Sequence, residues 1–284
     1  MQDDIEFGQA ERADLDVMID WAAAEGWNPG LSDAACFWEA DPEGFWVVRK
    51  DGAMAACISV VRYARDYSFL GFYITRPDLR GQGIGHALWQ HVMADRTARM
   101  TIGLDGVIDQ QLNYRKSGFT RAHRNIRYGG IPVLTNLDRD DLAPIDADHL
   151  AAVHAYDREF FPAARENFLN AWLTTPGHVA IAAMTDDAIS GYGVIRVCRE
   201  GHKIGPLFAD DVATAERLVG ALVTDADAGA GPVFIDPPFA NDASREMCER
   251  LGLAPVFETA RMYRGLVPQL RFPGMFGITT FELG

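Results

Sequence analysis

The sequence predicts a mixed α/β protein, with an α+β mixed sheet, whose plan occurs twice along the chain. The first observation is that short β-branched or aromatic stretches alternate with amphipathic helical stretches over residues 5–128. The second is their order: a strand–turn–strand hairpin precedes a strand–helix–strand unit, which brings antiparallel and parallel pairs into one sheet. The third is that the same plan returns about 130 residues later.

The first half is expected to follow the order β-α-β-β-β-α-β-α-β. Asn28-Pro29-Gly30 ends the first helical region and Lys50-Asp51-Gly52 forms the hairpin turn, because both are runs of turn-forming residues. Gly118 is well placed to end the last helix. The strands are expected at residues 5–7, 45–49, 54–63, 69–75, 100–104 and 124–128, and the helices at 14–24, 84–96 and 110–116.

The second half repeats landmarks of the first. A strand that ends in Asp105 is matched by a strand that ends in Asp236, and Arg127-Tyr128-Gly129-Gly130 is matched by Arg261-Met262-Tyr263-Arg264-Gly265. The stretch between the halves is rich in Gly, Pro and Asp, which suits a linker. Each copy is long enough to fold alone. The domains are expected at residues 1–130 and 144–284, with a linker at 131–143.

The composition argues against several classes of function. The formal net charge is −14 and Lys and Arg form no cluster, so a nucleic-acid partner is not expected. No apolar run approaches the roughly 20 residues of a membrane-spanning helix, and the acidic Met1-Gln2-Asp3-Asp4 is unlike a signal peptide. The four cysteines lack metal-ligand spacing, which predicts reduced thiols, no metal site and a cytoplasmic location.

The most informative stretch is a glycine-rich loop between a strand and a helix. It reads Arg80-Gly81-Gln82-Gly83-Ile84-Gly85 and follows Arg76-Pro77-Asp78-Leu79. Glycines let the backbone approach a ligand closely, and the first N–H groups of a helix lack partners and carry partial positive charge. Together with the guanidinium of Arg80, they form a site suited to phosphate groups.

A dinucleotide-binding (Rossmann) loop is an alternative interpretation of these glycines. Its third glycine would fall at His86, and its tight turn would follow the strand directly, where Arg76 to Leu79 intervene. Asp105 does lie about 20 residues after the glycines, where a ribose-binding acid would be expected. The hairpin that precedes the loop argues against this alternative, because Rossmann domains usually begin with the strand–loop–helix unit itself.

Two motifs together resemble the GNAT superfamily of N-acetyltransferases. The loop from Arg80 to Gly85 resembles the acetyl-CoA signature of that family, and Asn113-Tyr114-Arg115-Lys116-Ser117-Gly118-Phe119 resembles its second motif. The element order of residues 1–130 matches the GNAT fold. The whole chain resembles a subgroup in which a complete GNAT domain precedes a degenerate GNAT-like one, so two tandem GNAT-type folds are expected.

The resemblance implies an acyltransferase that moves acetyl from acetyl-CoA to the amine of a small-molecule acceptor, by direct attack in a ternary complex. Tyr114 matches the tyrosine that the family often places near the leaving sulfur, where its hydroxyl can donate a proton to the thiolate. The residues that the resemblance places against acetyl-CoA are Tyr73, Ile74 and Thr75 for the pantetheine arm and thioester carbonyl, and Arg80, Gly81, Gln82, Gly83, Ile84, Gly85 and His86 for the pyrophosphate.

The second half departs from this pattern. Residues 204–211 stand where its phosphate loop would lie, with one glycine, no arginine and two aspartates, and Cys248 stands at the position of Tyr114. Those carboxylates would satisfy the helix dipole and repel a diphosphate, so a second CoA site is not expected. The second half is expected to complete the acceptor pocket or a homodimer interface. The candidates for the cleft between the halves are Asp157, Glu159, Arg165, Asp236 and Asn241.

The sequence leaves the general base and the class of protein open. Glu39, Asp66 and Asp105 are the candidates for a base that deprotonates the acceptor, directly or through water. The alternative from another class is a non-catalytic module that senses acyl-CoA. Tyr114 beside an intact loop favours an enzyme, whereas the lack of an identifiable base favours the sensor.

Overall fold

The computed structural model describes residues 5–96, 100–134, 138–186 and 188–284. Residues 1–4, the acidic N-terminus, and residues 135–137 of the expected linker lie outside the described residues. The strands are β1 (Ile5–Gln9), β2 (Phe45–Lys50), β3 (Ala53–Arg62), β4 (Tyr67–Thr75), β5 (Thr101–Val107), β6 (Thr120–Gly130), β7 (Leu142–Pro144), β8 (His178–Thr185), β9 (Ala188–Val197), β10 (His202–Ala209), β11 (Val233–Ile235), β12 (Ala254–Arg264) and β13 (Met275–Gly277). The helices are α1 (Arg12–Ala24), α2 (Asp33–Ala40), α3 (Ile84–Arg96), α4 (Gln111–Lys116), α5 (Leu150–Asp157), α6 (Glu166–Thr174), α7 (Val212–Asp225) and α8 (Asp242–Arg250), with short 3₁₀ helices η1 (Pro77–Leu79), η2 (Ile108–Gln110) and η3 (Phe272–Gly274).

All these strands belong to one mixed sheet. Its order is β1-β2-β3-β4-β5-β12-β6-β11-β10-β9-β8-β7, and β13 pairs with β10 outside this path. The pairs β4–β5 and β10–β11 are parallel, and the pairs recorded between the other described strands are antiparallel. The predicted mixed α/β class is therefore confirmed.

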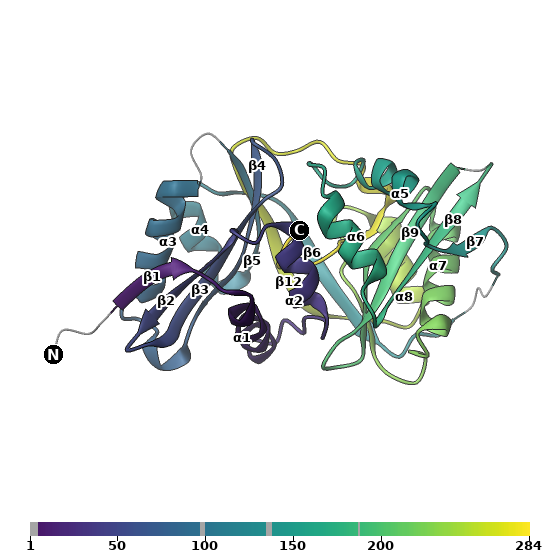
Figure 1. Cartoon of the computed structure of the whole chain (residues 1–284). Coiled ribbons are helices and arrows are strands. Elements are labelled where there is room, and N and C mark those ends of the chain that lie inside the picture. Colours follow the sequence, from purple (N-terminus) through teal and green to yellow (C-terminus); the bar gives the residue numbers. More distant parts are fainter. Residues whose placement is uncertain (1–4, 97–99, 135–137, 187) are drawn as a thin grey trace.

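The last strand of each half completes the sheet of the other half. β12, from the second half, lies between β5 and β6 of the first half, and β6 pairs in turn with β11 of the second half. β6 and β12 therefore lie side by side where the two halves meet (Figure 1). Each copy is long enough to fold alone, and in the structure the two halves share one sheet, because each supplies the strand that covers an edge of the other. The boundaries at 1–130, 131–143 and 144–284 remain a prediction.

Two equivalent ion pairs join the halves at these exchanged strands. Arg261 on β12 donates to Asp105 on β5, with N–O distances of 3.0 and 2.7 Å. Arg127 on β6 donates to Asp236, directly after β11, at 2.7 and 2.8 Å. All four side chains are buried. The aspartate and arginine landmarks that repeat in the sequence are thus partners across the halves, and breaking either pair would leave an uncompensated buried charge.

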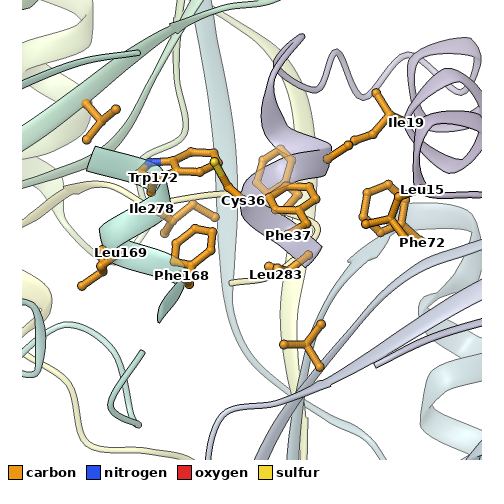
Figure 2. Close-up of a cluster of buried hydrophobic side chains, with 14 of the residues drawn as sticks. Leu15, Ile19, Cys36, Phe37, Phe72, Phe168, Leu169, Trp172, Ile278 and Leu283 are labelled. Atoms are coloured by element: carbon orange, nitrogen blue, oxygen red, sulfur yellow. The ribbon is translucent and has the colours of Figure 1, made fainter. Parts of the chain in front are cut away.

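The largest hydrophobic cluster also lies between the halves. Helix α2 packs against helix α6, where Phe37 stacks on Trp172 with ring centroids 6.0 Å apart and planes 7° apart (Figure 2). Ile278 and Leu283 from the C-terminal segment, residues 275–284, belong to the same cluster. Helix α2 was not predicted, because its eight residues follow closely on the turn at Asn28-Pro29-Gly30. Helices α3 and α4 pack on the opposite face of the first half, in a separate cluster.

The start of helix α7 accounts for the absence of a glycine-rich phosphate loop at residues 204–211 of the second half. Residues 204–209, expected to replace a phosphate loop, instead continue strand β10, and only Asp210 and Asp211 separate that strand from the helix. The side chain of Asp211 accepts a hydrogen bond from the N–H of Thr214 at 2.8 Å and so caps the helix. The prediction that a carboxylate satisfies this helix start is confirmed.

Candidate active site

The site begins where strands β4 and β5 separate. The two strands pair in parallel from Tyr67–Thr101 to Leu70–Leu104, but β4 continues to Thr75 and β5 to Val107. Phe72 has φ +46°, and the register between β3 and β4 shifts at the same level, so a bulge directs β4 away from β5. The edge of β4 that faces β5 therefore presents backbone groups to the gap instead of to a neighbouring strand.

A cavity of about 640 Å³ fills this gap and reaches both faces of the sheet. On the face of α3 and α4 it is bounded by Leu79, Ile84 and Tyr114, which pack with those helices. On the other face it is bounded by Trp27, Phe257 and Phe281, which pack with α1, α2 and the C-terminal segment. The remaining lining residues are Glu25, Leu70, Gly71, Phe72, Tyr73, Ile74, Thr75, Arg80, Gly81, Gly83, Gly85, His86, Leu104, Asp105, Val107, Asp109, Gln110 and Thr259.

The glycine-rich loop forms one end of the cavity. Gly81 and Gly83 have φ of +76° and +81°, and a Cβ atom on either would have nothing within 4 Å, so their backbone faces open space. The first hydrogen bond of helix α3 runs from the N–H of Ala87 to the carbonyl of Gly83, which leaves the N–H groups of residues 84–86 without a helical partner. This end of the cavity has the donors and the partial positive charge that an anion needs.

Arg80 lines the cavity and is held by two partners within the chain. Its Nε donates to the carbonyl of Thr75 at 3.0 Å, and its Nη2 forms an ion pair with Glu25, just after helix α1. Gln82 is the one residue predicted to contact acetyl-CoA that does not line the cavity, because its side chain donates to the carbonyl of Asp78 at 3.2 Å. The structure brings the other predicted residues together around the gap.

Tyr114 stands on helix α4 at the wall of the gap. It is 8% exposed and packs against Trp89 and Phe119, with ring centroids 5.8 and 6.3 Å away. A Cβ on Gly106 would lie 2.9 Å from the Tyr114 ring, so the glycine makes room for it. Burial, and next the neighbouring Tyr73, raises the pKa of the Tyr114 phenol well above its usual value. The phenol therefore stays protonated near neutral pH and can act as a proton donor.

The structure separates the three candidate bases. Glu39 on α2 and Asp66 in the β3–β4 turn are exposed and lie outside the cavity lining, whereas Asp105 lines the gap. Asp105 accepts hydrogen bonds from Arg261 and from Asn125, the latter at 2.8 Å. Burial raises the pKa of the Asp105 carboxyl, and the Arg261 guanidinium opposes that rise. Asp105 is thus the candidate within reach of a molecule in the cavity.

The five residues proposed for a cleft between the halves have structural partners. Asp157 and Arg165 form a buried ion pair at 2.6 Å, and Asn241 caps helix α8 and donates to three carbonyls. Asp236 binds Arg127, and Glu159 pairs with Arg271 at the surface. None of the five lines the cavity. The residues that do line it from the second half, Phe257, Thr259 and Phe281, belong to no recognisable motif and could not be found from the sequence.

The equivalent gap in the second half is filled by the chain itself. Strands β10 and β11 stop pairing after Ile204 and Ile235, and β13 then pairs with β10. The N–H of Ile278 donates to the carbonyl of Asp236, and a Cβ on Gly205 would lie 2.5 Å from the carbonyl oxygen of Thr279. The C-terminal segment therefore occupies the position that is open between β4 and β5.

Three further observations concern the described part of the chain. Over those residues, no three His, Cys, Asp or Glu side chains are grouped as a metal site requires. A search of the same residues finds no helix with the length and apolar character to span a bilayer. The four cysteines are free and buried.

Comparison with known proteins agrees with this geometry. The model of the Acetyltransferase (GNAT) family matches residues 12–110, and that of the Acetyltransferase (GNAT) domain matches residues 153–277. Holothin acyltransferase from Pseudoalteromonas sp. (strain SANK 73390) is 30% identical over 268 residues, which cover 94% of this chain and 90% of that protein.

Two solved structures share the fold over nearly the whole chain. A putative acetyltransferase from Pyrococcus horikoshii has a TM-score of 0.82 at 19% identity, over 99% of this chain and 96% of that one. A tandem GNAT protein from the clavulanic acid biosynthesis pathway has a TM-score of 0.64 at 16% identity, over 93% of this chain and 100% of that one.

The fold, the gap between β4 and β5 and these comparisons define a protein of the acyltransferase class. The chain belongs to the GNAT family and consists of two GNAT units in tandem. The resemblance based on the loop at residues 80–85 and the motif at residues 113–119 is therefore confirmed.

Proposed function

We propose that this chain transfers an acetyl group from acetyl-CoA to the amine of a small-molecule acceptor. The observation that carries the proposal is the continuity of the cavity, whose lining runs from the start of helix α3, past Tyr114, to Trp27, Phe257 and Phe281. The part of the cavity lined by these three aromatic residues is called the acceptor chamber. A donor and an acceptor can therefore meet in the gap from opposite faces of the sheet. Holding two reactants in this way supplies much of the rate of a group transfer.

The residues at the gap fit the chemical groups of acetyl-CoA. The N–H groups of residues 84–86, with the guanidinium of Arg80, suit the diphosphate. The free edge of β4 at Tyr73, Ile74 and Thr75 offers backbone groups to the amides of the pantetheine arm. Acetyl-CoA, when bound, supplies an activated acyl group as a thioester, and the remaining chemistry belongs to side chains of this chain.

The acceptor nitrogen bonds to the thioester carbonyl carbon while the carbon–sulfur bond breaks. In the proposal, Tyr114 donates its phenolic proton to the departing thiolate, and Asp105 takes the proton of the amine directly or through water. Burial raises the pKa of both groups, which makes the Asp105 carboxylate a stronger base than it would be in water and keeps the Tyr114 phenol protonated until a thiolate forms beside it. Binding at Trp27 and Phe281 orients the amine.

A sensor that binds acyl-CoA without turning it over remains the alternative. It needs the phosphate end of the cavity and the gap, but it has no need of the acceptor chamber or of a buried acid beside the gap. These two features support an enzyme. A homodimer and a cytoplasmic location remain predictions from the sequence.

Calorimetric titration with acetyl-CoA tests the proposal. We expect one acetyl-CoA per chain, no binding of NADH, and loss of binding in Gly83→Glu, which places a carboxylate where the diphosphate would lie. Gly52→Glu is the matched control, because Gly52 also has a positive φ (+78°), a side chain there meets nothing within 4 Å, and the position lies outside the cavity lining. Absence of acetyl-CoA binding in the wild type would overturn the proposal. Binding without release of CoA thiol across a panel of primary amines would favour the sensor.

A further inference from the structure

The loop between helices α1 and α2, residues 25–32, forms part of the acceptor chamber. Glu25 and Trp27 line the cavity, and Trp27 packs with the cluster that contains Phe281. The loop has little regular structure of its own, and Gly26 and Asn28 have φ of +81° and +50°. Its conformation, and with it the position of Trp27, must therefore be held by contacts from outside the loop.

One such contact is local, because the N–H of Trp27 donates to the carbonyl of Ala22 in helix α1 at 3.0 Å. The carbonyls of the loop are instead bound by cations buried between the halves. Arg127 Nη1 donates to the carbonyl of Trp27 at 2.7 Å, and Lys203 Nζ donates to the same carbonyl at 3.2 Å and to that of Asn28 at 2.7 Å. Arg127 and Lys203 are 2% and 1% exposed, and neither lines the cavity. Two positive side chains thus converge on the backbone of one loop.

The end of strand β9 and the turn between β9 and β10 form hydrogen bonds with the same loop. The side chain of Asn28 donates to the carbonyl of Glu200 at 2.9 Å and accepts from its N–H at 3.1 Å. The N–H of Leu31 donates to the carbonyl of Val197 at 2.9 Å. The loop of the first half is therefore docked on the second half through backbone groups and one asparagine side chain.

Arg127 also contacts the other aromatic walls of the chamber. Its guanidinium carbon lies 4.7 Å from the ring centroid of Phe281 and 5.7 Å from that of Phe257. Its Nε and Nη2 donate to the two carboxylate oxygens of Asp236. One buried arginine therefore touches all three aromatic residues that enclose the chamber, while Asp236 fixes its orientation.

The cost of burying Lys203 supports a specific role. Burial, and next the charge of Arg127, lowers the pKa of Lys203 to about 8. An apolar side chain would fill such a position at no electrostatic cost, and replacing buried charges by apolar groups is often neutral or stabilising. Besides a positive charge near Asp236 and Glu282, the ammonium group adds the pair of hydrogen bonds to the carbonyls of Trp27 and Asn28.

We propose that Arg127 and Lys203 are positioning residues for acyl transfer, through which the second half holds Trp27 against Phe257 and Phe281. This assigns the second half a part in acceptor binding, without a CoA site of its own. The inference rests on the proposed function, since it is the acceptor that the chamber would receive. Acetyl-CoA binding at the other face should not depend on it.

The test uses Lys203→Met in the full chain, with Lys50→Met, a partly exposed position outside the cavity lining, as its matched control. We expect the KM of the best amine from a panel of primary alkylamines and arylamines to rise about tenfold, with a smaller change in kcat. The Kd of acetyl-CoA should stay within about twofold of wild type. The double variant Lys203→Met with Trp27→Ala should be no worse than Trp27→Ala alone, because Lys203 acts through Trp27. An unchanged KM, or additive effects in the double variant, would overturn the proposal.

Hydrogen exchange provides a readout that does not need an acceptor. Residues 25–32 should exchange faster in Lys203→Met, while residues 67–75 of strand β4 exchange as in wild type. Exchange of the loop at the wild-type rate would overturn the proposal even if no amine is acetylated, which keeps it separate from the proposed function. Should Lys203→Met fail to fold, Arg127→Lys carries both measurements, because lysine keeps a positive charge beside Asp236 and lacks the guanidinium fork that reaches both Asp236 and the carbonyl of Trp27.

Discussion

Gly71 offers a direct test of how tightly the C-terminal segment is packed into the site. It lies on β4 directly before the bulge at Phe72, and it lines the cavity. A Cβ atom at this position would overlap the backbone carbonyl oxygen of Glu282 and would lie 2.9 Å from its carbonyl carbon and 3.2 Å from its Cα. Every one of these atoms is backbone, so no side-chain rotation can relieve the overlap in Gly71→Ala.

The expected loss of stability follows from the shift of the C-terminal segment that the extra methyl group requires. Forcing an extra methyl group into a packed core costs about 1–3 kcal/mol. Retreat of the segment also strains the hydrogen bond from the Tyr63 hydroxyl to the carbonyl of Leu283, now 3.1 Å long, and a lost hydrogen bond costs about 1 kcal/mol. We expect Gly71→Ala to lower the free energy of unfolding by about 2–4 kcal/mol. Because Phe281 adjoins Glu282, the acceptor chamber should be disturbed as well.

Urea unfolding of the purified chain, followed by circular dichroism, measures this effect. Gly8→Ala is the matched control, because Gly8 also lies in a strand, a Cβ there would meet nothing within 4 Å, and its φ is not positive. The control should stay within about 0.5 kcal/mol of wild type. If Gly71→Ala unfolds at the same urea concentration as Gly8→Ala, the segment is not packed against β4 in solution and the reasoning fails.

Three further predictions concern single side chains. Tyr114→Phe should lower kcat about a hundredfold or more if the phenol is the general acid, with the Kd of acetyl-CoA within about twofold of wild type; an unchanged kcat in a coupled thiol assay would remove Tyr114 from the chemistry. Glu25→Gln should tighten acetyl-CoA binding about two- to fivefold, because it frees Arg80 from its ion pair; calorimetry that shows weaker binding would contradict this. The free energy of unfolding of wild type, measured relative to that of Lys203→Met, should rise between pH 8 and about pH 10. Burial and the charge of Arg127 lower the pKa of Lys203 from 10.5 to about 8, so the unfolded chain binds more protons than the folded chain in that pH range. Asp236, Glu282 and Cys198 face the same ammonium group and are present in both proteins, so identical pH profiles would mean that Lys203 is not buried.

Local patterns in the sequence were sufficient to predict the strand, loop and helix that form the end of the cavity proposed to bind acetyl-CoA. The helix predicted at residues 84–96 and the strand predicted at 69–75 lie at Ile84–Arg96 and Tyr67–Thr75. Gly81 and Gly83 of the loop adopt the positive φ that only their lack of a side chain makes easy. Periodicity and turn chemistry act over a few residues, so they can be recognised without knowledge of the rest of the fold.

The acceptor end could not be predicted, because it is assembled from distant parts of the chain. Trp27, Phe257 and Phe281 are single aromatic residues in a loop, an exchanged strand and an irregular segment. The exchange of β6 and β12 is also invisible in the sequence, because the two strands are copies of one repeat and either could in principle complete either half. Only their register, with Arg261 opposite Asp105, shows which arrangement the chain adopts.

The exchanged strands also govern how the protein can be made. When β5 leaves the ribosome, its partner β12 lies about 150 residues further along the chain, and at about 5–20 residues per second it follows on the order of ten seconds later. During that interval the nascent first half presents an unpaired edge rich in backbone donors and acceptors, which is a template for aggregation. Contacts between such distant residues also slow folding itself. Demand for chaperones should therefore peak midway through translation, and a ribosome that stalls before Ala254 is added would leave β5 without its native partner β12.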